Sequence, residues 1–134
     1  MQFATIFYAF AMLLVCAFAA PLEVRQETVS NVKCTGTKAL DFHTSNVALL
    51  QICGGIAGSI QKCQGAPKST TGQSGNVRFT ITPVVKGDTI NISKGRWEQG
   101  IKAAFAVCGQ NIPFTATFTG GAAKGDVNVV YAEV

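Results

Sequence analysis

The chain has 134 residues, of which 48 % are hydrophobic, and carries a formal net charge of +4. This length leaves room for a single hydrophobic core once a targeting segment is removed. Its lysines are scattered singly and form no basic stripe, so we exclude nucleic acid as a partner and expect a surface mildly attracted to anionic walls, lipids or channel mouths.

The first residues are typical of a secretion signal. Residues 3–19 are almost wholly apolar and end in Ala17-Phe18-Ala19, the small-x-small pattern that signal peptidase cuts. We therefore predict a signal peptide over residues 1–19 and a secreted, extracellular protein. A membrane anchor is the alternative, but the run is short and stops in small residues, so we expect no stable membrane insertion. Residues 20–25 resemble a short fungal propeptide ending in a basic residue, with an unprocessed tail as the alternative.

Residues 26–134 are predicted to form one domain that keeps four cysteines, because Cys16 is removed with the signal peptide. The four are Cys34, Cys53, Cys63 and Cys108. An even number of cysteines in an exported chain favours two disulfides. A metal site is disfavoured, because the sequence has no Cys-x-x-Cys pair and a single histidine, His43. We expect no cofactor.

The first half of the domain is expected to contain a strand, a broken helix and a loop. Residues 29–33 are typical of a short strand. Thr44-Ser45-Asn46 are good capping residues for a helix whose apolar face is continued past Gly54-Gly55, which should break or kink it. The positions of that face are Val47, Leu50, Cys53, Ala57 and Ile60. Residues 64–75, rich in Gly, Ser and Thr, are expected to be a mobile loop.

The second half contains clearer periodic patterns. Residues 77–82 alternate apolar and polar side chains, a turn follows at 85–88, and Ile90 and Ile92 alternate again, which predicts a hairpin. Ser93 can cap a second helix that ends at Gly109. Its apolar stripe consists of Trp97, Ile101, Ala104, Phe105 and Cys108.

A last hairpin is predicted from residues 114–118 and 127–131, on either side of a turn that contains Gly120-Gly121. The element order is then β-α-β-β-α-β-β. This order is typical of an α+β fold, a two-layer α/β sandwich with an antiparallel sheet and two helices on one face.

The sequence signals no catalytic set. Asp41-Phe42-His43 contains a base and a carboxylate, but no Gly-x-Ser-x-Gly motif accompanies it, and four cysteines in an oxidising compartment offer no free thiol. We predict that the protein is not an enzyme. Asn91-Ile92-Ser93 is an N-glycosylation sequon, so we predict partial glycosylation of Asn91.

Several segments together resemble the killer protein 4 family, whose namesake is a virus-encoded toxin of smut fungi. They are Lys33-Cys34-Thr35-Gly36, Cys63-Gln64-Gly65, Ile92-Ser93-Lys94-Gly95, Val107-Cys108-Gly109 and the final strand Gly125 to Tyr131. The family fold is an α/β sandwich. The resemblance implies a non-enzymatic growth inhibitor or effector, with a calcium channel on another cell as a candidate target, and we expect a monomer.

The resemblance also bears on individual residues. Lys62 and Lys68 border the segment that matches the family's basic loop, and we predict that they contact the target.

We predict that Cys34 pairs with Cys108 and Cys53 with Cys63. In an unbroken helix the second pair would lie about 15 Å apart, beyond the roughly 7 Å that a disulfide tolerates, so the helix must end or bend at Gly54-Gly55.

Two other functions compete with the toxin or effector. A non-toxic extracellular wall or glycan binding protein would use Trp97, Tyr131 and the scattered lysines as contacts. A secreted hydrolase would need a concave pocket that holds His43 beside an acid.

Overall fold

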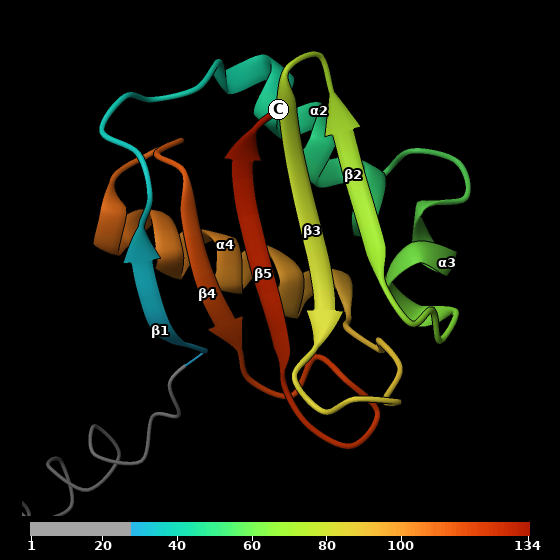
Figure 1. Cartoon of the computed structure of the whole chain (residues 1–134). Coiled ribbons are helices and arrows are strands. Elements are labelled where there is room, and N and C mark those ends of the chain that lie inside the picture. Colours follow the sequence, from blue (N-terminus) through green and yellow to red (C-terminus); the bar gives the residue numbers. More distant parts are fainter. Residues whose placement is uncertain (1–27) are drawn as a thin grey trace, which may run out of the picture.

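A computed structural model describes residues 28–134 as five strands and three helices, so the predicted signal peptide and propeptide lie outside the described residues (Figure 1). The strands are β1 (Val29–Cys34), β2 (Thr70–Ser74), β3 (Val77–Pro83), β4 (Phe114–Phe118) and β5 (Val127–Glu133). The helices are α2 (Phe42–Cys53), α3 (Ser59–Gln64) and α4 (Lys94–Cys108).

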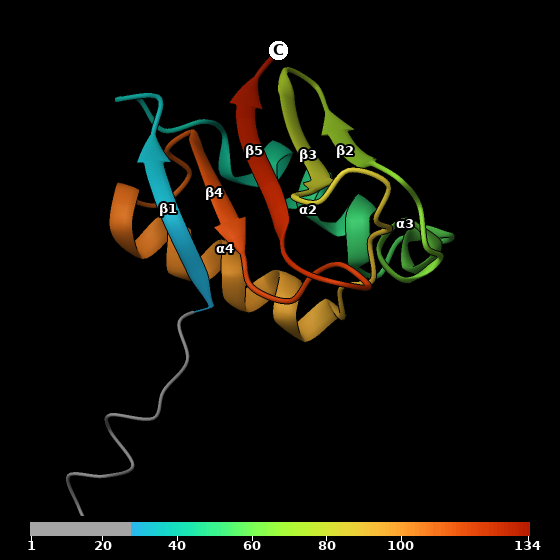
Figure 2. The ribbon, with the colours of Figure 1, turned by 60° about the horizontal axis from the view of Figure 1, so that its bottom comes forward.

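The five strands form one antiparallel sheet in the order β1-β4-β5-β3-β2. β5 is therefore the central strand, and β1 and β2 are the two edges. Helices α2 and α4 lie on the same face of this sheet, α2 against β2 and β3 and α4 against β1 and β4 (Figures 1 and 2). This arrangement confirms the predicted two-layer α/β sandwich.

The core lies between the sheet and the two long helices. Alternate residues of the three inner strands point toward the helices and are buried, as the period of two requires. They are Val77, Phe79, Ile81, Phe114, Ala116, Phe118, Val127, Val129 and Tyr131. The ring of Phe79 stacks on Tyr131 with centroids 4.5 Å apart and meets the edge of Trp97 at 5.5 Å, so aromatic contacts join the two layers.

Helix α4 agrees with its predicted cap and its predicted end. The side chain of Ser93 accepts a hydrogen bond from the backbone N–H of Arg96 at 3.2 Å, which satisfies one of the free donors of the first turn. Trp97, Ile101 and Ala104 are buried on the side that faces the sheet. Gly109 ends the helix with a φ of +107°, a conformation that other residues rarely adopt.

Helix α2 begins earlier than predicted. The carboxylate of Asp41, rather than a residue of Thr44-Ser45-Asn46, is the cap, and it accepts hydrogen bonds from the backbone N–H and the hydroxyl of Thr44 at 2.8 and 2.7 Å. These bonds lower the pKa of Asp41 below its usual value. The predicted break at Gly54-Gly55 is confirmed, since α2 ends at Cys53 and the short helix α3 starts at Ser59.

The interpretation of residues 64–75 as one loop is wrong. Thr70–Ser74 forms the edge strand β2, which pairs with β3 from Thr70↔Ile81 to Ser74↔Val77. The strand lacks apolar alternation because its central inward position is Gly72, where an added Cβ would lie 2.2 Å from the carbonyl oxygen of Ala48 in α2. The helix packs so closely on this strand that no side chain fits.

The predicted strand at Ile90 and Ile92 is also wrong. Both side chains are fully buried, but the backbone N–H of Ile90 bonds to Pro67 and that of Ile92 bonds to Cys63, each at 2.8 Å. The segment forms one isolated antiparallel β-bridge, between Ile90 and Ala122, and is not a strand of the sheet. The partner of β3 in the hairpin is therefore β2, and the predicted order β-α-β-β-α-β-β applies with this exchange and the added helix α3.

Two disulfides connect the elements, in the pairs that the sequence analysis expects. Cys34–Cys108 joins the end of β1 to the end of α4, with Cα atoms 5.5 Å apart. Cys53–Cys63 joins the end of α2 to α3, with Cα atoms 5.4 Å apart, because the chain turns back between the two helices. Disulfides persist in oxidising compartments, so this framework is consistent with a small extracellular protein.

Candidate functional site

A cleft lies between α2 and α4, on the face of the sheet that the helices cover. Its volume is about 250 Å³. Residues from both helices form its apolar walls, and Phe79 of β3 contributes from the sheet. The apolar lining consists of Phe42, Leu49, Leu50, Phe79, Ile101 and Phe105.

Polar groups of the cleft form a buried network with the sheet. The Oγ of Ser45, which lines the cleft, lies 2.6 Å from the phenol oxygen of Tyr131. The hydroxyl of Tyr131 also donates to the carbonyl of Asn111 at 3.3 Å. Burial raises the pKa of Tyr131, although its bonds to Ser45 and Asn111 oppose that rise. The phenol therefore keeps its proton to a higher pH than an exposed tyrosine does.

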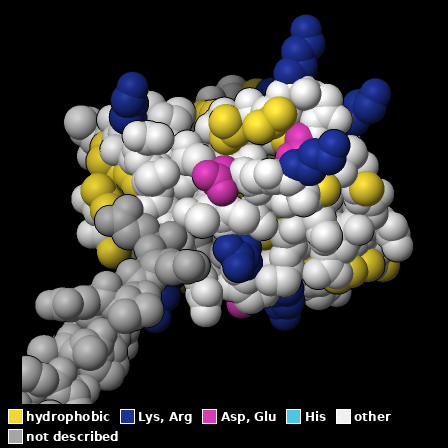
Figure 3. Space-filling model, turned by 90° about the horizontal axis from the view of Figure 1, so that it is seen from below, with side chains coloured by type: hydrophobic (Ala, Val, Ile, Leu, Met, Phe, Trp, Pro, Cys, Tyr) yellow, Lys and Arg dark blue, Asp and Glu magenta, His cyan; other side chains and the backbone are white. Residues whose placement is uncertain are grey.

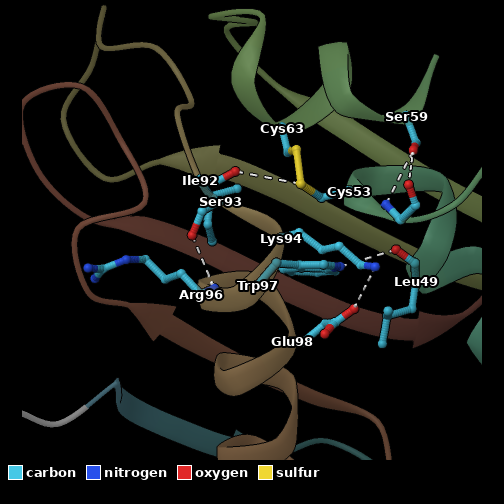
Figure 4. A network of polar contacts seen from close by, with 11 residues as sticks. Leu49, Cys53, Ser59, Cys63, Ile92, Ser93, Lys94, Arg96, Trp97 and Glu98 are labelled. Carbon is cyan, nitrogen blue, oxygen red and sulfur yellow. Dashed lines mark hydrogen bonds and ion pairs between the residues drawn. A yellow bond between two sulfur atoms is a disulfide. The ribbon is translucent and has the colours of Figure 1, made fainter.

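The charged side chains of the cleft differ in their partners. Glu98 lines the cleft and lies 3.9 Å from the ammonium group of Lys94, one turn earlier on α4 (Figure 4). Lys102 also lines the cleft and is exposed, and among the described residues it has no ion-pair or hydrogen-bond partner. The ammonium group of Lys102 is thus available to pair with a ligand.

Trp97 belongs to the core between the two helices. Its side chain is fully buried, and the indole N–H donates to the carbonyl of Leu49 in α2 at 3.1 Å (Figure 4). Tyr131 is likewise fully buried. The expectation that these two aromatics would contact glycans is therefore wrong, because neither ring reaches the surface.

The two predicted target-binding lysines border the connection from α3 to β2. Lys62 is exposed, but its ammonium group donates to the carbonyl of Thr71 in the edge strand at 3.2 Å. The neighbouring outward N–H of Gln73 donates to the side chain of Gln51 at 2.9 Å. Lys62 and Gln51 thus cover polar groups of an edge that would otherwise be open to pairing with another chain. Lys68 is exposed in the connection itself.

The surface shows no single basic patch on the face drawn in Figure 3. Its Lys and Arg side chains stand apart from one another, with acidic and uncharged groups between them. This agrees with the scattered lysines of the sequence. Any electrostatic attraction of this face to an anionic surface is consequently spread over it.

Asn91 lies outside the regular elements, two residues before Ser93, the cap of α4. It is exposed, and its backbone N–H donates to the carbonyl of Gly121 at 2.9 Å. The site is sterically open to a glycan, and partial glycosylation stays a prediction.

The residues considered for catalysis are not assembled in the cleft. His43 is exposed near the start of α2 and is not among the residues that line the cleft, and the carboxylate of Asp41 serves as the helix cap. Residues 28–134 contain no group of three or more His, Cys, Asp or Glu side chains placed to hold a metal ion.

Sequence reasoning did not find the cleft. Leu50, Ile101 and Phe105 belong to the predicted apolar stripes, whereas Phe42 and Leu49 lie off the predicted stripe of the first helix, and these two apolar residues are the signal that the sequence contains. The predicted apolar face of the first helix is also wrong, because α2 buries Ser45, Ala48, Ile52 and Cys53, whereas Ala57 and Ile60 are exposed.

Comparison with known proteins gives no relative. No family model, no curated protein and no solved structure matches this chain. Within the described part of the chain, no helix is long and apolar enough to cross a membrane.

Proposed function

We propose that this protein is a secreted toxin or effector that acts on another cell by binding a surface target, without catalysing a reaction. The observation that carries the proposal is the pair of disulfides, which fastens an edge strand and the short helix to the two long helices. Such fastening suits a small domain that must stay folded outside the cell. The apolar first 19 residues and the resemblance to the killer protein 4 family support the same function.

The proposed contact surface includes the connection from α3 to β2. Lys68 is exposed there, and Lys62 stands beside it over the edge strand. A calcium channel of the target cell is the candidate partner that the family resemblance suggests. Attraction between lysines and acidic groups at a channel mouth would be screened by salt, since the Debye length falls from about 10 Å at 0.1 M to about 3 Å at 1 M.

The test is a dose series of the oxidised mature protein on several fungal and plant cell types, with growth and calcium uptake as readouts. The Lys62→Gln/Lys68→Gln variant removes both charges and keeps a side-chain N–H near Thr71. The matched control is Lys38→Gln/Lys86→Gln, which removes two exposed charges elsewhere. We expect wild type and control to inhibit with equal potency, the first variant to be several-fold weaker, and reduced protein to be inactive.

Absence of an effect of wild type on any cell type would reject the toxin or effector function. Equal potency of both double variants would reject the role of Lys62 and Lys68 and leave the function itself in place.

A further inference from the structure

The cleft between α2 and α4 has the size of a small-ligand site. An apolar cavity of about 150 Å³ is known to hold benzene, so about 250 Å³ would hold a molecule of about ten non-hydrogen atoms. Six of the twelve lining residues are apolar, and they come from α2, α4 and β3. An apolar body of that size would therefore be enclosed from three sides.

One aromatic residue is left in water at the mouth of this cleft. Phe42 is 65 % exposed, the largest exposed fraction among the large hydrophobic residues described. It is the first residue of α2, and the cap at Asp41 fixes the start of that helix. Folding gains little from an aromatic ring in this position, whereas an apolar body seated beside Leu50 and Phe105 would remove part of its surface from water.

The charges at the mouth favour an anionic head group. Lys94 lies beside Glu98 and offsets its charge, while Lys102 has no partner among the described residues. Of the two charged residues that line the cleft, Glu98 already has a cationic neighbour and Lys102 has no ion-pair partner in the described part of the chain, so the site favours an anionic over a cationic head group. A carboxylate could accept hydrogen bonds from Lys102 and from the exposed amide of Asn46, which also lines the cleft.

We propose that the cleft binds a small amphiphile of about ten non-hydrogen atoms in all, with an apolar body and a carboxylate head that pairs with Lys102. The body lies against Leu49, Leu50, Ile101 and Phe105. This site is separate from Lys62 and Lys68, neither of which lines the cleft, so the proposal does not depend on the toxin function.

The test uses octanoate, which matches this size, with octan-1-ol and octylammonium as probes that share the body and differ in the head. Trp97 reports binding by its fluorescence, because it contacts Phe79 and Leu49, which line the cleft. Titration calorimetry on the oxidised domain gives the stoichiometry. We expect one octanoate per chain, with a dissociation constant on the order of 1 mM or below.

Three variants assign the binding to the cleft. Lys102→Met should weaken octanoate about three- to tenfold and leave octan-1-ol unchanged, as expected for loss of one exposed ion pair. Asn46→Phe, at an exposed position of the wall, should fill the cleft and weaken all probes at least about tenfold. Lys86→Met, an exposed lysine that does not line the cleft, is the matched control and should bind like wild type.

Thermal unfolding and disulfide mapping of each variant establish that it is folded before it is titrated. The proposal is overturned if octanoate shows no saturable binding, if Lys102→Met binds it as wild type does, or if Asn46→Phe leaves the affinity unchanged. Concentration-dependent association of the free protein that buries Phe42 would also overturn it in favour of a second copy as the occupant of the cleft.

Discussion

Two glycines of α4 meet very different surroundings. A Cβ added at Gly100 would lie 2.4 Å from the ring of Phe118, whereas one added at Gly95 would meet no atom within 4 Å. We expect Gly100→Ala to lower the free energy of unfolding by about 1–3 kcal/mol through overpacking. Gly95→Ala should raise it by about 0.5 kcal/mol, because alanine has the higher helix propensity. Urea unfolding of both variants checks this, and equal effects would contradict the close packing of α4 on β4.

Tyr131 should make stability depend on alkaline pH. Burial raises its pKa in the folded domain above the ordinary value of 10.0, so its contribution is fully present below pH 10 and is lost as the pH rises through the folded-state pKa. The unfolding free energy of wild type should therefore fall above pH 10 more steeply than that of Tyr131→Phe. At neutral pH the variant should be less stable by about 1 kcal/mol, because Ser45 loses its partner.

Rapid urea unfolding at a series of pH values, with the difference between the two proteins as readout, separates Tyr131 from the lysines, which both proteins share. Parallel curves above pH 10 would mean that the phenol ionises without penalty in the folded state.

At the scale of elements, the two disulfides should contribute unequally. Cys34–Cys108 closes an interval of 74 residues and Cys53–Cys63 one of 10. In the chain-entropy model these loops correspond to about 4.5 and about 2.8 kcal/mol, respectively. We expect Cys34→Ser/Cys108→Ser to lower the midpoint of urea unfolding more than Cys53→Ala/Cys63→Ala. The reverse order would show that packing of the buried second bridge outweighs the loop entropy.

Helix α4 and strand β2 show which elements can be predicted from a sequence and which cannot. The helix has a long apolar stripe, a serine cap and a glycine stop, so local signals agree with its packing. β2 carries none of these signals, because α2 excludes any side chain at Gly72, and its neighbours on that side are Thr70 and Ser74. Ile90 and Ile92 gave the opposite error, since a buried irregular segment can alternate without pairing. Burial alone does not distinguish a strand from such a segment.

The Cys53–Cys63 disulfide and the cleft also differ in whether they can be predicted from the sequence. Gly54-Gly55 indicates where α2 must end, and that constraint is local, so Cys53 and Cys63 could be matched from the sequence. The cleft depends on how far apart α2 and α4 stand on the sheet. That separation follows from Trp97 and its bond to Leu49, a contact across 48 positions that no periodicity contains.

For the molecule as a whole, β5 is the strand on which the sheet depends. β4 pairs with it on one side and β3 on the other, so the two halves of the sheet meet only there. Val130 points to the exposed face, so replacing it leaves the core intact. We expect Val130→Pro to unfold the domain, because proline removes a ladder N–H and is not tolerated in a central strand, while Val130→Thr should change stability by less than about 1 kcal/mol.

Circular dichroism and urea unfolding of the two variants decide this prediction. A cooperative, native-like transition for Val130→Pro would show that the halves of the sheet hold together through the helices instead.

The late position of β4 and β5 in the chain also sets an order of events if the chain is exported. All four cysteines of residues 28–134 precede β4 and β5 in the sequence, so in a chain exported from its N-terminus their thiols would reach the oxidising compartment before the strand that pairs with β1. Until β4 has been added, no strand pairs with β1, and Cys34 can meet Cys53 or Cys63 by chance. Such premature disulfides would have to be reshuffled by thiol–disulfide exchange, which takes seconds to hours depending on the oxidant and the isomerase. The cellular yield of this domain should therefore depend on disulfide isomerase more than its small size suggests.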